Sequence, residues 1–263
     1  MKFNILTIFP EIFTGFSNTG VVGKAIEKNI TSINLVNPRD FAEDKHQSVD
    51  SPPYGGGDGM LMKFAPLGKA IESLKSKGDA GRVVSLSPQG SKWSNEKAKS
   101  WAESSENITL VCGRYAGIDQ RFTNHYVDEE ISLGDYIISG AELAAQIIMD
   151  STMRFIPEVL GHSDSAIKET FNNSLLEAPQ FTQPFSVNNL SIPEVLASGH
   201  HKKIEQWKKN VSIVRTKILR PDLLVQSNVT QNEVDEALAF VSHMPVNELE
   251  ALGLSPEQLS EHK

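Results

Sequence analysis

The sequence has a single cysteine and no long apolar run. Cys112 is the only thiol in the 263 residues, which excludes an intramolecular disulfide, and no cysteine–histidine spacing suited to a metal ion is present. Because Cys112 lies within an apolar segment, we expect a buried thiol in a reducing compartment. No apolar stretch approaches the roughly 20 residues needed to cross a bilayer, and residues 1–10 look like a first strand rather than a signal peptide. These absences predict a cytoplasmic protein without a membrane partner and without a metal site.

The chain also lacks a net excess of basic residues. Its formal charge is −8 and its pI is near 5.4, which argues against a nucleic-acid partner for the chain as a whole, since phosphate binding depends on basic groups. The charge is unevenly distributed, however. Between Gly199 and Pro221 there are seven lysines and arginines and one glutamate, whereas seven acids and one lysine follow Val229. The simplest interpretation of the basic segment is a solvated helical face. The uneven distribution of charge along the chain is nevertheless more informative than the net charge.

Residues 107–146 have the clearest organisation in the chain. The β-branched run Ile108–Cys112 predicts a buried strand and is followed by a polar turn that contains two glycines. A second turn lies between Gly134 and Gly140, and glycines at such places let backbone groups approach a ligand closely. Turns at successive strand ends predict a small-molecule pocket. Ordinary tight turns of an α/β core explain the glycine spacing equally well.

A helix is predicted to follow the second turn. Ser139–Glu142 matches a capping box, so the helix is expected to start near Ala141 and to continue to about Phe155, where Ile156-Pro157 ends it. Three apolar residues of this helix are expected to lie on one face, namely Leu143, Ile147 and Ile148.

The other segments predict strands and helices followed by a helical C-terminal part. Strands are expected at Lys2–Phe9, Ile33–Val36 and Arg82–Leu86, and helices at Gly23–Lys28, Gly68–Lys75 and 95–103, the last capped by Ser94. The segment Asp50–Met60, rich in proline and glycine, predicts a loop folded back on the protein. A later helix is expected to be capped by Thr230 and Glu233. The pattern predicts an α/β domain at 1–160, a flexible linker at 161–190 and a smaller helical domain at 191–263.

Short motifs are spread from Lys2 to about Leu224. They are Ile8-Phe9-Pro10-Glu11, Pro53-Tyr54-Gly55-Gly56-Gly57 with Gly59-Met60, Leu86-Ser87-Pro88-Gln89-Gly90, Val111-Cys112-Gly113-Arg114-Tyr115, Gly117-Ile118-Asp119, Gly134-Asp135-Tyr136, Arg154-Phe155-Ile156-Pro157 and Val159-Leu160-Gly161-His162. In this order they resemble the bacterial tRNA (guanine-N1)-methyltransferase family, TrmD, of the knotted SPOUT class. The resemblance implies a homodimer with a trefoil-knotted N-terminal α/β domain and a smaller, mainly helical C-terminal domain. Periodicity does not predict the knot, since most chains are unknotted.

The resemblance also implies a reaction, a cofactor and a partner. The reaction is methyl transfer from S-adenosyl-L-methionine to N1 of the guanosine immediately 3′ of the anticodon, position 37 of tRNA. The cofactor is expected at the strand-end turns, at Leu86, Pro88, Gly113, Leu133, Gly134, Asp135, Tyr136, Ile137, Ile138 and Gly140. A loop nucleotide is easier to flip out than one in a duplex, and the basic segment fits a contact with the tRNA anticodon arm. The family also suggests a dependence on Mg²⁺, for which no ligand residue can be named.

Methylation of guanine N1 requires a base for the N1 proton and a donor for the charge that builds on O6. In the family these are an aspartate in the linker and an arginine near the end of the long helix. Arg154 matches the arginine, and by analogy with oxyanion-hole donors its charge could contribute roughly 3 to 4 kcal/mol. Glu169 stands at the position of the aspartate and is the predicted general base, with Asp164 as the second candidate. Glutamate moves the carboxylate by about one methylene, and a misplacement of ~1 Å can lower a rate on the order of 100-fold.

Other positions depart from the family pattern. Ala116 and Gln120 replace glutamates, Ala141 replaces a glycine, Ala144 a proline, and Asp58 a proline of the glycine-rich loop. The carboxylate missing at position 116 matters most, because that position lies in a turn on the cofactor side. Three interpretations stay open: an active tRNA guanine-N1 methyltransferase, a catalytically impaired relative that binds tRNA, and a SPOUT methyltransferase that acts on another RNA.

Overall fold

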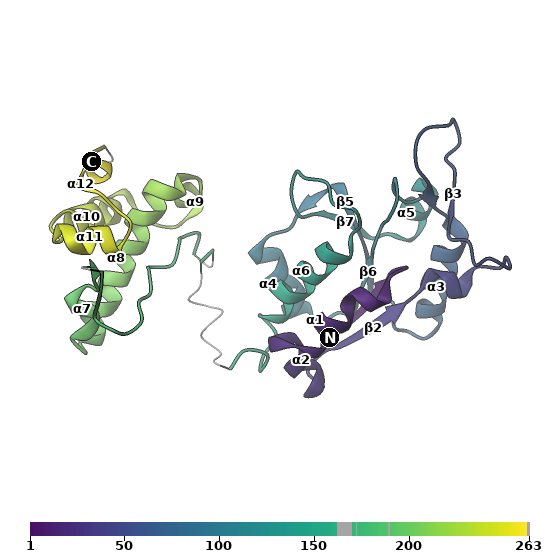
Figure 1. Cartoon of the computed structure of the whole chain (residues 1–263), viewed down its shortest axis with the longest axis horizontal. Helices are drawn as coiled ribbons and strands as arrows, with labels where there is room; N and C mark the ends of the chain where they lie inside the picture. The colour runs from purple at the N-terminus through teal and green to yellow at the C-terminus, as the bar shows by residue number, and fades with distance from the viewer. Residues whose placement is uncertain (162–169, 172, 189, 262–263) are drawn as a thin grey trace. The chain divides into compact units, whose positions relative to one another are not determined.

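The computed structural model describes residues 1–161, 170–171, 173–188 and 190–261 and divides into two compact units, Met1–Ala166 and Ile167–Lys263. Each unit has its own core and is described by itself (Figure 1). The predicted boundaries at 160 and 190 stay predictions, and the two predicted bases, Glu169 and Asp164, lie outside the described residues. Among the residues described, none of the helices is long and apolar enough to span a membrane.

A five-stranded parallel sheet forms the centre of the first unit, in the order β2-β1-β6-β5-β7. The strands are β1 (Lys2–Leu6), β2 (Ser32–Val36), β5 (Arg82–Lys92), β6 (Ile108–Val111) and β7 (Glu129–Ser132). All four residues of β6 are buried, as expected for a central strand of a parallel sheet that has helices on both faces. The predicted α/β class is therefore confirmed.

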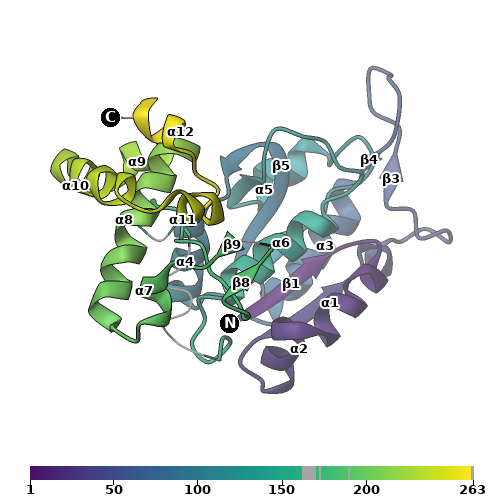
Figure 2. The same cartoon turned by 60° about the vertical axis from the view of Figure 1, so that its left-hand side comes forward.

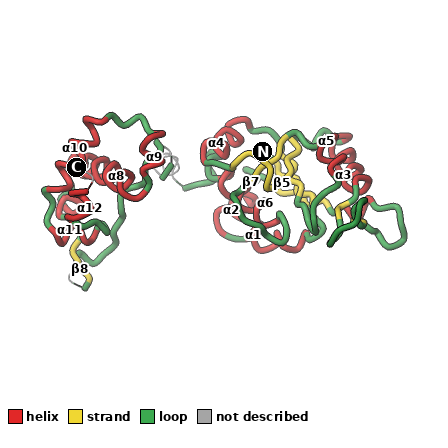
Figure 3. The backbone as a smooth tube through the Cα atoms, turned by 90° about the horizontal axis from the view of Figure 1, so that it is seen from above, coloured by secondary structure: helices red, strands yellow, loops and turns green. Residues whose placement is uncertain are grey.

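Helices cover the two faces of the sheet (Figures 1 and 3). One core joins Ile5 of β1 to α2 (Gly20–Glu27), α4 (Asn95–Ser104) and α6 (Glu142–Met153). A second core joins Leu6 of β1 to α3 (Phe64–Ser76) and α5 (Gln120–Tyr126). Successive residues of β1 thus enter opposite layers, as strand geometry requires. Short helices precede α2 and follow β2: η1 (Pro10–Phe13), α1 (Thr14–Asn18) and η2 (Pro38–Phe41).

Several predicted elements differ in extent from the observed ones. Helix α3 begins at Phe64 rather than Gly68, because Pro66 lies in its first turn, where a missing N–H removes no helical hydrogen bond. Strand β5 continues to Lys92 past a break in its register, whereas the prediction ended at Leu86. The cap of α4 is confirmed: Ser94 Oγ accepts a hydrogen bond from Lys97 N at 3.3 Å.

The capping box predicted at Ser139–Glu142 is wrong. Helix α6 begins at Glu142 with Ala141 as its N-cap and without a side-chain cap. Its predicted apolar face is also wrong, because Leu143 and Ile147 are exposed while Ile148 is buried. Small residues, Ala144 and Ala145, turn toward the core instead.

The segment Asp50–Met60 leads into a short antiparallel pair of strands, β3 (Asp50–Ser51) and β4 (Leu61–Met62). The prediction of a loop folded back on the protein holds at its end, where Met60 O accepts a hydrogen bond from Ala116 N at 2.9 Å. The loop between the strands is exposed, and the side chain of Tyr54 is 100% exposed.

The second unit is mainly helical (Figure 2). Its elements are β8 (Ser186–Val187), β9 (Leu190–Ser191), α7 (Glu194–Ala197), α8 (His201–Leu219), α9 (Pro221–Gln226), α10 (Gln231–Ser242), α11 (Val246–Ala251) and α12 (Pro256–Glu261). Its core is built around Trp207, and Leu175 and Ala178 of the predicted linker pack against it. The predicted capping box of α10 is confirmed, with Thr230 and Glu233 bonded in both directions.

Candidate functional site

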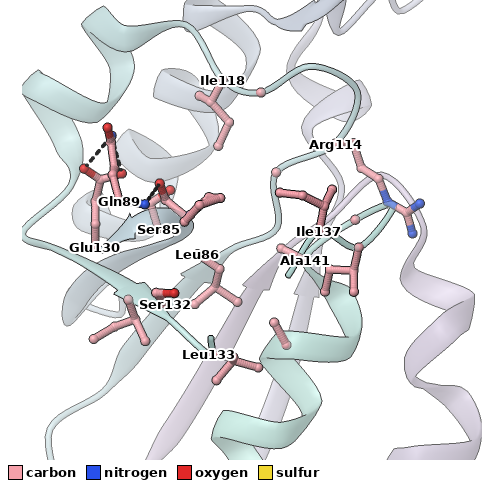
Figure 4. Close-up of a pocket in the computed structure, with 18 of the residues that line it drawn as sticks. Ser85, Leu86, Gln89, Arg114, Ile118, Glu130, Ser132, Leu133, Ile137 and Ala141 are labelled. Atoms are coloured by element: carbon pink, nitrogen blue, oxygen red, sulfur yellow. Dashed lines mark hydrogen bonds between the residues drawn. The ribbon is translucent and has the colours of Figure 1, made fainter. Parts of the chain in front are cut away.

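A turn that interrupts β5 and the turns that follow β6 and β7 enclose a cavity of about 540 Å³ at the carboxyl edge of the sheet (Figure 4). In an open parallel sheet this edge is where ligands bind. Nine of the ten predicted cofactor residues line the cavity, and their role as cofactor ligands stays a prediction. The exception is Asp135, whose side chain is exposed and whose Oδ2 lies 3.8 Å from Lys92 Nζ. Side chains of Leu86, Leu133 and Ala141, each from a different part of this edge, surround the same space (Figure 4).

The first turn, Ser87–Gly90, interrupts the pairing of β5 with β7. Leu86 pairs with Ile131, the chain then loops outward, and Ser91 pairs with Ile131 again. A Cβ added to Gly90 would lie 2.4 Å from Ile131 N, so only glycine fits where the loop returns to the sheet. Gln89 Nε2 donates to the Glu130 carboxylate at 3.0 Å, which ties the loop to β7.

The second turn, Gly113–Gly117, is held to the strand β4. Met62 N donates to Gly117 O at 2.9 Å, and Ala116 N donates to Met60 O at 2.9 Å. Tyr115 has a φ of 61° and Gly117 a φ of 131°, which gives the turn its sharp reversal. Ala116 lines the cavity, so the carboxylate that the family resemblance leads one to expect is missing from its wall.

The third turn runs from Leu133 to Ala141 and closes against the second. Arg114 and Gly140 form an isolated β-bridge, and Ala141 N donates to Gly113 O at 3.1 Å. Ile137 is largely exposed at the cavity wall. The cavity therefore has apolar side chains together with backbone groups of glycine-rich turns, a lining suited to a small ligand with a polar end and an apolar end.

A buried ion pair lies beneath the junction of the second and third turns. Glu142 is 1% exposed; its Oε1 accepts from Thr7 Oγ1 at 2.9 Å, and its Oε2 lies 2.8 Å from Arg114 Nη2. That 2.8 Å contact is an ion pair without hydrogen-bond alignment, since Oε2 has no hydrogen-bond partner. The Arg114 guanidinium also lies 4.6 Å from the centre of the Phe9 ring. It points away from the cavity (Figure 4), so Arg114 positions the turns from behind.

Sequence reasoning missed this role of Glu142. The local spacing of Ser139 and Glu142 indicated a helix cap, whereas the partners of Glu142 are Thr7 and Arg114, far away in the chain. The only local indication is that an acidic residue opens a helix whose other residues are mostly apolar.

Cys112 is fully buried, as predicted, and lies between β6 and the second turn. Burial raises the pKa of its thiol well above the usual range, and the negative charge of Glu142 raises it further, while Arg114 lowers it. A thiol in this state is a weak nucleophile, so Cys112 serves as part of the core.

Of the predicted catalytic pair, only Arg154 lies among the described residues, so the pairing with Glu169 stays a prediction. Arg154 follows the last turn of α6, and its N–H donates to Asp150 O at 3.3 Å. The cavity lies at the other end of this helix, where Ala141 and Ala144 line it. At 1.5 Å per residue, about 15 Å of helix separates Ala144 from Arg154.

Metal ligation has no obvious location in the part of the chain that the structure describes. No group of three or more His, Cys, Asp or Glu side chains there is arranged to hold an ion. Mg²⁺ dependence stays a prediction from the resemblance.

Comparisons with known proteins agree with the motifs. Residues 1–226 match the family model described as tRNA (Guanine-1)-methyltransferase TrmD. Curated relatives named tRNA (guanine-N(1)-)-methyltransferase include one from Hydrogenovibrio crunogenus, 46% identical over 85% of this chain and 94% of the relative. Another, from Hahella chejuensis, is 47% identical over 88% and 90%. One from Shewanella sediminis is 43% identical over 92% of this chain and 100% of its own length.

Proposed function

Since the chain belongs to the tRNA (Guanine-1)-methyltransferase TrmD family, we propose that it methylates N1 of the guanosine at position 37 of tRNA in the cytoplasm. The methyl donor is S-adenosyl-L-methionine. The observation that supports the proposal most directly is the cavity at the carboxyl edge of the sheet, lined by nine of the ten residues at which the family resemblance expects the cofactor.

The cavity residues fit this cofactor chemically. A volume of about 540 Å³ lies in the range of ligand pockets. Leu86, Leu133 and Ile137 supply apolar walls for the adenine ring, while the backbone groups of the glycine turns can hydrogen-bond its polar edge. When bound, the cofactor supplies an electrophilic methyl group on a sulfonium.

In the proposed chemistry, the chain itself must remove the N1 proton and stabilise charge on O6. We assign the first task to Glu169 and keep Asp164 as the second candidate. Arg154 is assigned to the guanine, where its cation offsets the charge that develops on O6. Glu169 and Asp164 lie outside the described residues, so these roles are supported by the family match alone.

The length of α6 supports a homodimer with shared sites. About 15 Å of helix between Ala144 and Arg154 exceeds the reach of an arginine side chain, so the arginine that meets the cofactor of one chain would come from a second copy. Mixing Arg154→Ala chains with cofactor-deficient chains, for example Ile137→Arg, tests this. Random pairing restores about a quarter of the sites if the two chains share a site and none if each site is built from one chain.

A SPOUT-type trefoil knot in the first unit is part of the same proposal. Its support is the family match, together with the β-bridge between Arg114 and Gly140 that joins the second and third turns. The second unit is proposed to contact the tRNA anticodon arm.

The salt bridges of α8 limit the set of basic residues that we propose to contact the tRNA. Lys209 is paired with Glu233 at 2.7 Å and Arg220 with Asp222 at 2.7 Å, so these cations are already neutralised. Exposed lysines lie in the first half of the helix, at Lys202, Lys203 and Lys208. Replacing all three by glutamine should reduce the salt dependence of tRNA binding, with a slope smaller by about 2 to 3. Lys209→Gln, the matched control, should change it little.

The decisive test is a methyl-transfer assay with labelled cofactor and unmodified tRNA, beside a tRNA with the target guanosine replaced. Guanosine-dependent incorporation supports the proposal. Glu169→Gln should lower the rate by ~100- to 10,000-fold while cofactor affinity stays unchanged. Confirmed binding of cofactor and tRNA without incorporation by the unaltered chain would refute the enzyme and leave a tRNA-binding relative.

A further inference from the structure

One face of the basic helix α8 changes from exposed to covered along its length. Lys202 and Lys209 lie seven residues apart, which is two helical turns, so both side chains project from the same face, roughly 10 Å apart along the helix axis. Thr216, seven residues further on, continues the same row. Lys202 is exposed and the Lys209 side chain is 52% exposed, whereas Thr216 is buried.

The part of the face beyond Lys209 is covered by chain from the start of the second unit. Leu176 N donates a hydrogen bond to Thr216 Oγ1 at 2.8 Å, and Leu176 O accepts a hydrogen bond from Ser212 Oγ. Side chains of α8 therefore hold both backbone groups of Leu176 against this face. An RNA backbone that follows the row from its exposed end meets Lys209 last.

Lys209 is held in an ion pair with Glu233 of α10. Glu233 Oε1 accepts a hydrogen bond from Lys209 Nζ at 2.7 Å, while Glu233 Oε2 accepts from Thr230 N at 2.9 Å and from Thr230 Oγ1 at 3.0 Å. The bonds from Lys209 and then from Thr230 lower the pKa of Glu233 to about 2, so its carboxylate is charged at neutral pH. The carboxylate cannot leave Lys209 by rotating away without opening the capping box of α10.

Helix α10 keeps this negative charge at a fixed place relative to α8. The two helices share a buried apolar core that includes Val211 and Leu238. Helix α10 lies beyond the residues that match the family model, and exposed Asp235 and Glu236 add two further negative charges to it. A phosphate that approaches Lys209 must displace one carboxylate and is repelled by the other acids of α10.

We propose that Glu233 is a specificity-determining residue of the RNA contact. By neutralising Lys209 it confines the RNA backbone to the first half of α8, where Lys202, Lys203 and Lys208 are exposed. A substrate RNA is held by its target base in addition to these contacts, whereas any other RNA has only backbone contacts and gains most from a further cation. This inference rests on the proposed function, because it takes the second unit to contact the tRNA.

Glu233→Gln is the direct test, because glutamine at this position also completes a capping box, so the charge is lost while the start of the helix is kept. The affinity of the whole protein for an unmodified anticodon stem-loop and for a plain RNA duplex of equal length would be measured at about 50 and 200 mM salt. One additional phosphate contact increases the loss of affinity between these salt concentrations by about 3-fold.

Glu233→Gln should show an increase of this size with the duplex and should bind the duplex about 3-fold more tightly at the lower salt concentration. Its preference for the stem-loop over the duplex should fall by about the same factor. Duplex binding equal to that of the unaltered protein would overturn the proposal. Equal gains for the stem-loop and the duplex would overturn the role in specificity.

A second substitution identifies the cation responsible. Adding Lys209→Gln to Glu233→Gln should return the duplex affinity and its salt dependence to those of the unaltered protein. A gain that persists in this double variant would come from the change in net charge and would also overturn the proposal. Glu250→Gln removes the same charge at an exposed site of α11 and is the matched control, for which duplex binding should stay unchanged.

Failure of this proposal can be told apart from failure of the proposed function. If the unaltered protein transfers no methyl group but Glu233→Gln still strengthens duplex binding, the proposed reaction is refuted and the role of Glu233 stands. If transfer proceeds and Glu233→Gln binds the duplex no more tightly than the unaltered protein, the reaction stands and the role of Glu233 is refuted.

Discussion

Gly140→Ala should displace the guanidinium that locks the two cavity turns together. A Cβ at position 140 would lie 2.0 Å from Arg114 Nε and 2.3 Å from Arg114 Cζ. Both distances are well below van der Waals contact, so the side chain of Arg114 must move. Arg114 cannot move freely, because its guanidinium lies 2.8 Å from the Glu142 carboxylate and 4.6 Å from the centre of the Phe9 ring.

The size of the effect follows from burial. Once Arg114 withdraws, Glu142 is left as an uncompensated carboxylate that is 1% exposed. Removing one partner of a buried ion pair costs about 3 to 5 kcal/mol. The Arg114 side chain is 19% exposed, which favours the lower end, about 3 kcal/mol. For a unit of this size that corresponds to a decrease in Tm of roughly 6 to 12 °C.

Calorimetric unfolding would measure the loss, and a double-mutant cycle would identify its cause. In an Arg114→Ala background the clash is gone, so Gly140→Ala should then cost less than about 1 kcal/mol. Gly15→Ala is the control: no atom lies within 4 Å of its added Cβ, and it lies in α1, where alanine is slightly stabilising. An equal cost of Gly140→Ala with and without Arg114 would refute the reasoning.

Three further outcomes are expected. Glu142→Gln keeps an acceptor for Thr7 but loses the charge, so urea unfolding should show the first unit destabilised by about 2 to 3 kcal/mol; no change would mean that the ion pair is not stabilising. Cys112 should react with a thiol reagent only at the rate of unfolding, because burial raises its pKa; fast labelling of the native protein would contradict this. Glu233 has a pKa lowered to about 2 from 4.5 by hydrogen bonds from Lys209 and the cap residue. Its contribution to stability is therefore present above about pH 4.5 and lost as the pH falls toward 2, and Glu233→Gln should abolish that part of the acid unfolding curve.

The strands were predictable because their pattern is local. Ile108–Val111 is rich in β-branched residues and buried on both faces, and Lys2–Leu6 has a similar apolar run. Each strand can therefore be predicted from its own residues, without knowledge of the strands that pair with it. The continuation of β5 beyond Leu86 was not predictable, because Ser87–Gly90 reads as a turn and only pairing with Ile131 makes Ser91 part of the strand again. The knot stays a prediction, since no local pattern encodes threading.

The candidate site was predictable where glycine marks it. Gly113, Gly134 and Gly140 each follow or flank a strand end, and parallel strands bring such ends to one edge. Glu142 was misinterpreted because a capping box and a buried partner both require an acid at the start of a helix. Only the fold distinguishes them, by placing Thr7 against the same carboxylate. Sequence reasoning also missed a cavity that lies between β3, β4, α3 and α5, because its walls come from segments far apart in the chain.

The hairpin strand β4 and the second turn behave as one hydrogen-bonded unit. Met62 N donates to Gly117 O at 2.9 Å, Asp119 N donates to Met62 O at 3.0 Å, and Ala116 N donates to Met60 O at 2.9 Å. Any shift of the β3–β4 hairpin must break these bonds or carry the turn with it, and the turn is a wall of the cavity at the carboxyl edge of the sheet. A ligand that orders this turn therefore lowers the entropic cost of ordering the hairpin, and the coupling must act equally in both directions. The absence of a carboxylate at Ala116 leaves these backbone bonds intact, so its consequences belong to the chemistry in the cavity rather than to the connection between the hairpin and the turn.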